Sequence, residues 1–293
     1  MNSFPLFSSL FRIARPWQLL AGILLYNVGG GIVHFLGGGI DWNVYIIGQA
    51  CFTLLQLSSY YLSAYYGVFV QQDGQAVENP VLRSILLQIT VTILTIGAVL
   101  TVLLIIRGVM TLPCFFVLGL TFLLAFFYAV PPYRLTDSGY GELAQAVFVA
   151  NLAPAWAFIL QTGELHRLLA MLTFPLSSVY LAMTLAQSMQ WYAGDLKRQH
   201  KTMMVRMGWQ RAVSLHNFLV IGAYLLIGLA TVLGLPWSLT WPVLLTLPVG
   251  LLQLWLMNQI VSGARPRWLL LRAVSASLVA LMAYLVSLAL WTG

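Results

Sequence analysis

Basic side chains interrupt an otherwise apolar sequence, and their chemistry suits an anionic ligand. Guanidinium and ammonium groups bind phosphate or carboxylate oxygens through charge-assisted hydrogen bonds, which arginine can make in parallel pairs. A diphosphate, a phospholipid headgroup or a carboxylated aromatic compound would each fit such a group. The competing interpretation is that these cations only orient the chain beside anionic lipids. The residues concerned are Arg134, Lys197, Arg198, Lys201 and Arg206.

Most acidic residues lie in the same parts of the sequence as these cations. There are seven Asp and Glu residues in all, against 14 Lys and Arg. Polar chemistry is therefore concentrated in a few segments between apolar runs, although loops also gather polar residues for solvation alone. The acids concerned are Asp73, Glu78, Asp137, Glu142 and Asp195.

Tyrosine and glutamine provide further candidate ligand contacts. Gln187 and Gln190 precede Asp195 by less than three helical turns. An unpaired amide in apolar surroundings is costly, so these side chains should face a ligand cavity or bond to other helices. A group of tyrosines could line a slot for an isoprenoid tail or a quinone ring, or could sit at the membrane interface. These are Tyr60, Tyr61, Tyr65 and Tyr66.

Cysteine, histidine and glycine show no recognised metal or phosphate motif. Cys51 and Cys114 both lie inside apolar runs, which is typical of core residues. The glycine triplets at 29–31 and 37–39 lack the GxxxxGK[ST] pattern of a phosphate loop, and we assign them to close packing and a turn. The histidines show neither HExxH nor a paired-ligand spacing; they are His34, His166, His200 and His216.

The composition predicts that these residues are held by membrane-spanning helices. Of the 293 residues, 60% are apolar and only 7% are charged, and the mean hydropathy is +0.89. Soluble proteins carry about 25% charged residues. The net charge of +7 does not indicate a nucleic-acid partner, because the basic residues form no patch with aromatic neighbours. We expect one membrane domain over residues 1–293.

Apolar runs of about 20 residues, the length that spans a bilayer, recur along the chain. The first follows residues 1–16 without a small-residue cleavage site, so we expect a retained helix and no removed signal. The predicted fold is all-α, a polytopic bundle of nine transmembrane helices. The runs are 17–36, 43–70, 84–106, 108–130, 142–161, 168–192, 212–234, 237–261 and 268–291.

The distribution of basic residues predicts the orientation of this bundle. If the N-terminus is cytoplasmic, every Lys and Arg except Arg107 and Arg167 falls on the cytoplasmic side. The positive-inside rule therefore places loops 2–3, 4–5, 6–7 and 8–9 in the cytoplasm and the C-terminus outside. No charged residue lies near the middle of a span, which disfavours an ion-coupled transporter.

One loop sequence resembles a known family. Residues 128–143, YAVPPYRLTDSGYGEL, are similar to the YxxPPxRLxxxGxGE segment of the UbiA superfamily of intramembrane prenyltransferases. The menaquinone-type branch, which prenylates dihydroxynaphthoate, is the most similar. Shorter matches are Arg15-Pro16, Gln161-Thr162-Gly163, and Asp195 followed by Lys201-Thr202 and by Val205-Arg206-Met207-Gly208. Together these matches extend over most of the chain.

The resemblance implies a helical bundle with a central cavity that is open to lipid and capped by loops 2–3 and 6–7. In active members, two aspartate-rich motifs hold Mg²⁺ against the diphosphate of an allylic isoprenoid. Carboxylate and phosphate oxygens suit octahedral Mg²⁺, which neutralises the leaving group. By this resemblance Asp73 and Asp195 are the candidate metal ligands, and both, with Lys201, are candidate catalytic residues.

The sequence departs from the family pattern at most of the motif acids. In the first motif, Ser63 and Ala64 stand in place of Asn-Asp, and Gly67 replaces the next Asp. In the second, Trp191 stands where the first Asp belongs. These side chains cannot supply the carboxylates that assemble a metal–diphosphate cluster. Of the five expected acids, only Asp73 and Asp195 remain.

We therefore interpret the chain as a UbiA-like protein that binds an isoprenoid or quinone but has impaired Mg²⁺-dependent transfer. Its partners would be membrane lipid and other subunits of a membrane complex. The alternative is an active prenyltransferase of quinone biosynthesis with a rearranged metal site formed by Asp73, Glu78 and Asp195. The candidate ligand-binding residues are Arg134, Arg198, Arg206, Tyr60, Tyr65, Gln187, Gln190 and Trp191.

Overall fold

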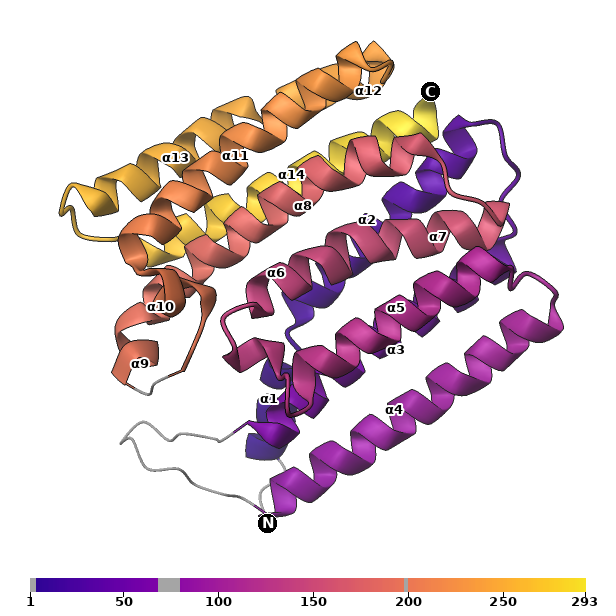
Figure 1. Ribbon diagram of the computed structural model, residues 1–293, viewed down its shortest axis with the longest axis horizontal. Helices are drawn as coiled ribbons and strands as arrows, with labels where there is room; N and C mark the ends of the chain where they lie inside the picture. Colours follow the sequence, from indigo (N-terminus) through magenta and orange to yellow (C-terminus); the bar gives the residue numbers. More distant parts are fainter. Residues whose placement is uncertain (1–3, 68–79, 198–199) are drawn as a thin grey trace.

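The computed structural model describes residues 4–67, 80–197 and 200–293, and this part of the chain is helical without a single strand (Figure 1). The first half contains α1 (Phe4–Ile13), α2 (Pro16–Phe35), α3 (Trp42–Tyr66), α4 (Pro80–Ile106), α5 (Leu112–Ala129), α6 (Gly141–Ala146) and α7 (Ala153–Thr162). The second half contains α8 (Arg167–Ser188), α9 (Tyr192–Lys197), α10 (Met203–Met207), α11 (Trp209–Val232), α12 (Trp237–Leu244), α13 (Leu247–Val261) and α14 (Trp268–Thr292). Three short helices of other types complete it: η1 (Leu135–Asp137), η2 (Val147–Leu152) and η3 (Met189–Trp191).

The prediction of an all-helical membrane bundle is confirmed, and the number of spans is close to the nine predicted. Within the described residues seven helices are long and apolar enough to cross a bilayer, or eight if the bent pair α12 and α13 is one span. The predicted span that is missing from this count is α3. It is 25 residues long but contains several amide, serine and tyrosine side chains, which lower its mean hydropathy. Which end of the bundle faces the cytoplasm stays a prediction.

Local sequence explains where several helices begin. The Asp41 carboxylate accepts hydrogen bonds from the backbone N–H groups of Asn43 and Val44 and so caps α3. Thr202 caps α10 in the same way through Val205. Proline occupies the first turn of α2 and of α5, where its missing N–H costs nothing.

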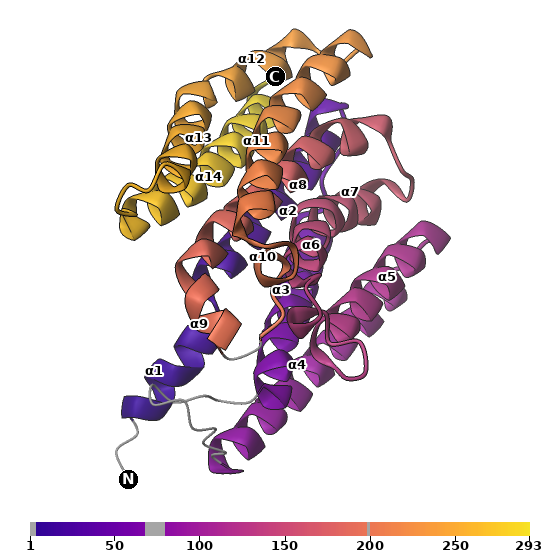
Figure 2. The same ribbon diagram turned by 60° about the vertical axis from the view of Figure 1, so that its left-hand side comes forward.

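The bundle is built around α8 and α2. Helix α8 packs against α11 and α14, α2 packs against α7 and α14, and α3 packs against α4 and α5. Figures 1 and 2 show α4 at one margin of the bundle and α12 and α13 at the opposite margin. The aromatic residues Tyr26, Trp156 and Tyr180 are fully buried in the core of the bundle. The short elements α1, η1, α9 and α10 gather at one end, which we call the cavity end.

Candidate functional site

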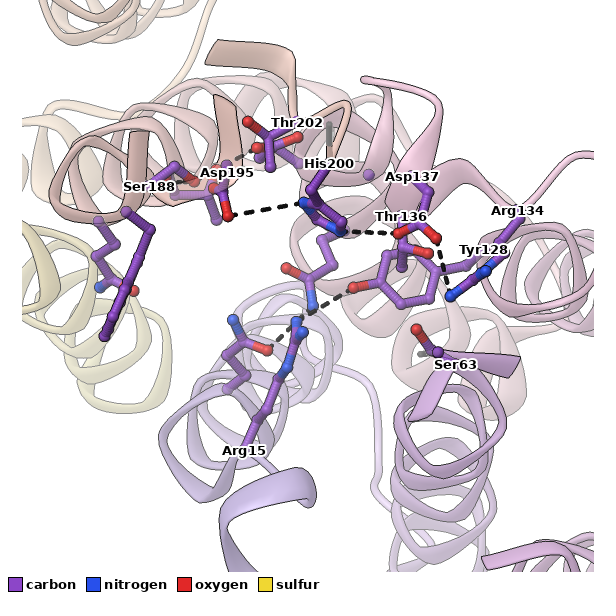
Figure 3. A pocket seen from close by; sticks show the side chains of 18 residues that line it. Arg15, Ser63, Tyr128, Arg134, Thr136, Asp137, Ser188, Asp195, His200 and Thr202 are labelled. Carbon is purple, nitrogen blue, oxygen red and sulfur yellow. Dashed lines mark hydrogen bonds and ion pairs between the residues drawn. The ribbon is translucent and has the colours of Figure 1, made fainter. Parts of the chain in front are cut away.

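A cavity of about 690 Å³ opens at the cavity end (Figure 3). Its wall comes from the start of α2, the end of α3, the end of α5, the segment from η1 to α6, and the C-terminal part of α8 with the chain that follows. Most of the lining residues have polar side chains. The lining residues are Arg15, Gln18, Ser63, Gly67, Tyr128, Arg134, Thr136, Asp137, Gly141, Glu142, Gln145, Thr184, Gln187, Ser188, Trp191, Asp195, His200 and Thr202.

Arg15 provides an exposed positive charge on one wall of this cavity. Its Nη1 donates a hydrogen bond to the Tyr128 hydroxyl at 3.2 Å, and its guanidinium carbon lies 5.4 Å from the centre of the Tyr60 ring. In the part of the chain that the structure describes, no carboxylate lies within ion-pair distance of Arg15. Arg15 is therefore fixed in position by neutral aromatic side chains and keeps its charge available to a ligand.

Amide side chains support Arg15 from beneath. Gln145 donates from Nε2 to Gln18 Oε1 at 3.0 Å. Gln56 donates from Nε2 to the Gln18 carbonyl at 2.8 Å and to the Tyr60 hydroxyl at 2.9 Å. Gln18 and Gln145 of the lining are thus bonded to each other, and Gln56 bonds to Gln18 from outside the lining. Such hydrogen bonds fix side-chain positions.

A row of charged side chains crosses the opposite wall (Figure 3). Arg134 Nη2 lies 2.8 Å from Asp137 Oδ2, and His200 Nε2 lies 2.8 Å from Asp137 Oδ1. On its other side, His200 Nδ1 lies 3.9 Å from Asp195 Oδ1. The imidazole ring of His200 therefore stands between two carboxylates that come from different segments of the chain.

The neighbouring charges shift the pKa values of this pair. The hydrogen bond to Asp137 raises the pKa of His200 above its usual 6.5, against burial, which acts in the other direction; Asp195 and Glu142 add to the increase. Burial alone would raise the pKa of Asp137, but the hydrogen bond with His200 and the charge of Arg134 outweigh it and lower that pKa below 3.8. Both shifts favour the charged forms.

We expect this ion pair to stabilise the fold most between pH 3.8 and 6.5, the usual pKa values of the two groups. The raised pKa of His200 gives stability that is lost as the pH rises through that raised value, and the lowered pKa of Asp137 gives stability that is lost in strong acid. Histidine NMR should give a midpoint for His200 above 6.5, which decreases in Asp137→Asn. An unchanged midpoint in that variant would contradict the assigned pairing.

A second set of contacts joins the segment from η1 to α6 with α8 and with the chain around α10. Glu142 accepts hydrogen bonds from the Ser188 hydroxyl at 3.3 Å and from the Met203 backbone N–H at 3.2 Å. Arg206 donates from Nη1 to the Ser138 carbonyl at 3.1 Å, and its guanidinium carbon lies 4.4 Å from the centre of the Tyr140 ring. Glu142 and Arg206 therefore join the η1–α6 segment to α8 and to the chain around α10.

The structure brings four of the sequence-predicted residues together in the cavity lining: Arg134, Gln187, Trp191 and Asp195. Two others, Asp73 and Arg198, lie outside the described residues, as does Glu78 of the alternative metal site. Asp195 and the chain after it, including His200, thus share one cavity with the end of α3.

The remaining candidates lie away from the cavity lining. Tyr60 is buried beneath Arg15, and Tyr65 packs with Tyr66 while Arg83 covers its ring at 4.9 Å. Gln190 has a buried Oε1 without a hydrogen-bond partner in the described part of the chain.

Lys201 and Arg206 belong to the contacts between segments. Lys201 is exposed and pairs through its backbone with Ser138. Arg206 bonds to the same residue, as described above. Neither side chain lines the cavity.

Several lining residues were absent from the sequence-based candidates. In the sequence analysis Arg15 appears only as part of a family match. His200 was passed over because it has no histidine partner at a metal-ligand spacing. The others are Gln18, Tyr128, Asp137, Glu142, Gln145, Thr184, Ser188 and Thr202.

Within the described residues the donors of the lining fit Mg²⁺ poorly, and Asp73 and Glu78 lie outside those residues. Ser63, Gly67 and Trp191, which stand in place of motif residues, all line the cavity. Among the residues that the structure describes, no group of three or more His, Cys, Asp or Glu side chains is placed to hold a metal ion. Asp195, the remaining acid of the second motif, faces His200 instead. Mg²⁺ prefers an octahedral set of oxygen ligands, which this wall does not supply.

Comparison with known proteins gives one family. The model of the UbiA prenyltransferase family matches residues 24–271, whereas no curated protein sequence matches. A UbiA homolog from Archaeoglobus fulgidus bound to GPP and Mg²⁺ superposes with a TM-score of 0.67 at 16% identity, over 95% of this chain and 99% of that chain. The same homolog bound to DMAPP and Mg²⁺ gives 0.65 with the same identity and coverage. A structure from work on digeranylgeranylglyceryl phosphate synthase in membranes gives 0.61 at 13% identity, over 100% and 99% of the two chains.

Proposed function

Because the chain belongs to the UbiA prenyltransferase family, we propose that it binds an isoprenoid or quinone and has impaired magnesium-dependent transfer. It would act as an accessory subunit of a membrane complex. One observation carries the proposal: the cavity positions that correspond to two motif acids are occupied by Gly67 and Trp191, and Ser63 occupies that of the motif Asn. These side chains preserve the cavity while removing the groups that would hold a metal diphosphate.

The charges of the lining support a ligand with a compact headgroup. Arg134 is already paired with Asp137. Arg15 is therefore the arginine of the described lining that can donate hydrogen bonds to a carbonyl oxygen or a single anionic oxygen of a ligand. Trp191, with 58% of its surface exposed, offers a flat apolar face on the same cavity. A quinone ring, as in the menaquinone-type branch, combines carbonyl oxygens with a flat apolar body and so suits both features.

Mass spectrometry of lipids bound to the gently purified protein tests this proposal. We expect an isoprenoid or quinone whose amount does not depend on Mg²⁺, because apolar and headgroup contacts supply the affinity. Trp191→Ala should reduce the bound lipid about tenfold, the effect of losing an aromatic contact of 1–1.5 kcal/mol. Tyr65→Ala is the matched control, because Tyr65 lies on the α4 side of α3. Bound diphosphate that requires Mg²⁺ would contradict the proposal.

The second candidate function is active prenyl transfer in quinone biosynthesis. It is favoured by the position of Asp195 in the cavity lining and by the Mg²⁺ and prenyl diphosphate in the A. fulgidus homolog. Asp73 and Glu78 would have to complete the metal site. This function predicts robust product formation that is lost in both Asp73→Ala and Asp195→Ala.

A further inference from the structure

Four exposed arginines in the second half of the bundle have no acidic partner. The sequence contains no Asp or Glu after Asp195. In the part of the chain that the structure describes, no carboxylate lies within ion-pair distance of any of the four guanidinium groups. Their positive charge is therefore available to a ligand outside the protein. The four are Arg211 of α11, Arg265 and Arg267 of the connection between α13 and α14, and Arg272 of α14.

Helix packing gathers these arginines at one corner of the bundle. The start of α11, the end of α13 and the start of α14 share one buried apolar cluster, in which Ala212 and Leu271 are the sequence neighbours of Arg211 and Arg272. Figure 1 shows the connection between α13 and α14 at the same end of the bundle as α10. The arginines thus lie around one corner of the cavity end, although none of them lines the cavity.

A chain of hydrogen bonds leads from the core to an exposed amide near this corner. Gln253 Nε2 lies 2.8 Å from His216 Nε2, and His216 Nδ1 lies 3.0 Å from Asn217 Oδ1. Because an amide oxygen only accepts, His216 carries its proton on Nδ1 and accepts from Gln253 at Nε2. Asn217 Nδ2 then donates to Asn258 Oδ1 at 3.0 Å. Asn258 is exposed in the last turn of α13, so its NH₂ group is free to donate to a ligand.

Apolar side chains continue along the surface from these polar groups. Phe218 is exposed two turns after Arg211, on the same face of α11. On α13, Trp255 and Leu251 are exposed one and two turns before Asn258, again on the same face. The surfaces of both helices are therefore polar at the cavity end and apolar beyond it. An amphiphile with a polar headgroup and apolar chains matches this order.

We propose that this corner binds the phosphate headgroup of an anionic phospholipid, whose acyl chains lie along α11 and α13. The arginines supply charge-assisted hydrogen bonds to the phosphate oxygens, and Asn258 donates to a phosphate or ester oxygen. A zwitterionic lipid fits less well, because its headgroup also carries a cation that the arginines repel. This site lies outside the cavity and does not depend on the ligand proposed there.

Native mass spectrometry of the purified full-length protein, with dioleoylphosphatidylglycerol or dioleoylphosphatidylcholine added, tests this site. We expect the wild type to bind phosphatidylglycerol about thirtyfold more tightly than phosphatidylcholine. Arg265→Gln combined with Arg267→Gln should lose most of this preference, because each arginine near an anionic lipid surface contributes about fivefold in affinity. The matched control is Arg107→Gln combined with Arg167→Gln, which removes the same charge from exposed positions at the opposite end of the bundle and should bind like the wild type.

Asn258→Asp tests the amide separately. The aspartate keeps an oxygen that accepts from Asn217, but it places a carboxylate among the arginines in place of the NH₂ group. It should therefore weaken the binding of phosphatidylglycerol about as much as the double arginine variant. Unchanged size-exclusion elution and tryptophan fluorescence show that each variant is folded.

Four results would overturn the proposal. The first three are equal affinity of the wild type for the two lipids, an equal loss in both double arginine variants, and wild-type binding by Asn258→Asp. The fourth is displacement of bound phosphatidylglycerol by inorganic phosphate at constant ionic strength, because the corner would then take free phosphate and not a lipid.

Discussion

Purified protein supplied with an allylic isoprenoid diphosphate, dihydroxynaphthoate and Mg²⁺ is expected to form prenylated product about a thousandfold more slowly than a family member with both acidic motifs. A metal ion that neutralises a leaving diphosphate contributes several kcal/mol to the transition state, and about 4 kcal/mol corresponds to this factor. In this chain, Trp191, Ser63 and Gly67 line the cavity where that metal would be held. Product measured by chromatography against a family member with intact motifs gives the comparison.

The controls decide whether any residual product comes from this chain. Asp195→Ala removes the cavity carboxylate of the second motif, and Asp73→Ala removes the remaining acid of the first. Robust product that disappears in both variants would establish the alternative, active enzyme. Equal product in the wild type and both variants would identify a contaminating enzyme.

The membrane bundle could be predicted from sequence because it depends on local properties. Apolar runs of spanning length are visible in one dimension, and the described helices fall on the predicted runs. The loop sequence at 128–143 could also be assigned to the site from sequence, because residues close together in it, Tyr128, Arg134 and Glu142, all line one cavity. Trp191 and Asp195 are four residues apart and share a helical face across η3 and α9, so both meet the cavity.

The positions of Tyr60 and Tyr65 outside the cavity lining have a simple geometric cause. Ser63 and Gly67 are four residues apart and line the cavity. Tyr65 is two residues from each, which places it about 200° around the helix, against α4. Tyr60 is three residues before Ser63 and lies nearer the cavity, but Arg15 covers its ring. Helical periodicity anchored on the motif would have separated these residues.

The role of His200 could not be read from the sequence. Its partner Asp137 is 63 residues away, and their contact depends on how η1 packs against the chain after α9. Neither residue belongs to a spacing pattern that predicts the other. Arg15 likewise meets Tyr128 across 113 residues. Long-range pairs of this kind are set by the packing of whole helices, which local sequence patterns do not specify.

Gly29→Val is expected to be the most destabilising single change considered for this chain. Gly29 of α2 faces α7 so closely that an added Cβ would lie 2.1 Å from the Pro154 carbonyl oxygen and 2.8 Å from the Ala157 Cβ. Small residues allow membrane helices to approach in this way, and the sequence-based assignment of the 29–31 triplet to close packing is thereby confirmed. A backbone carbonyl cannot rotate away like a side chain, so valine would have to push α2 and α7 apart.

Overpacking of this kind costs about 3 kcal/mol, which should lower the apparent Tm in detergent by about 10 °C. Size-exclusion chromatography after heating, with tryptophan fluorescence as the signal, measures that shift. Gly97→Val is the matched control, because Gly97 lies in α4 with no atom within 4 Å of an added Cβ. Valine also has the better helix propensity, so Gly97→Val should be as stable as the wild type. If Gly29→Val has the same apparent Tm as Gly97→Val, α2 and α7 are not in this close contact. The contact between α2 and α7 would then not hold the cavity wall that begins at Arg15.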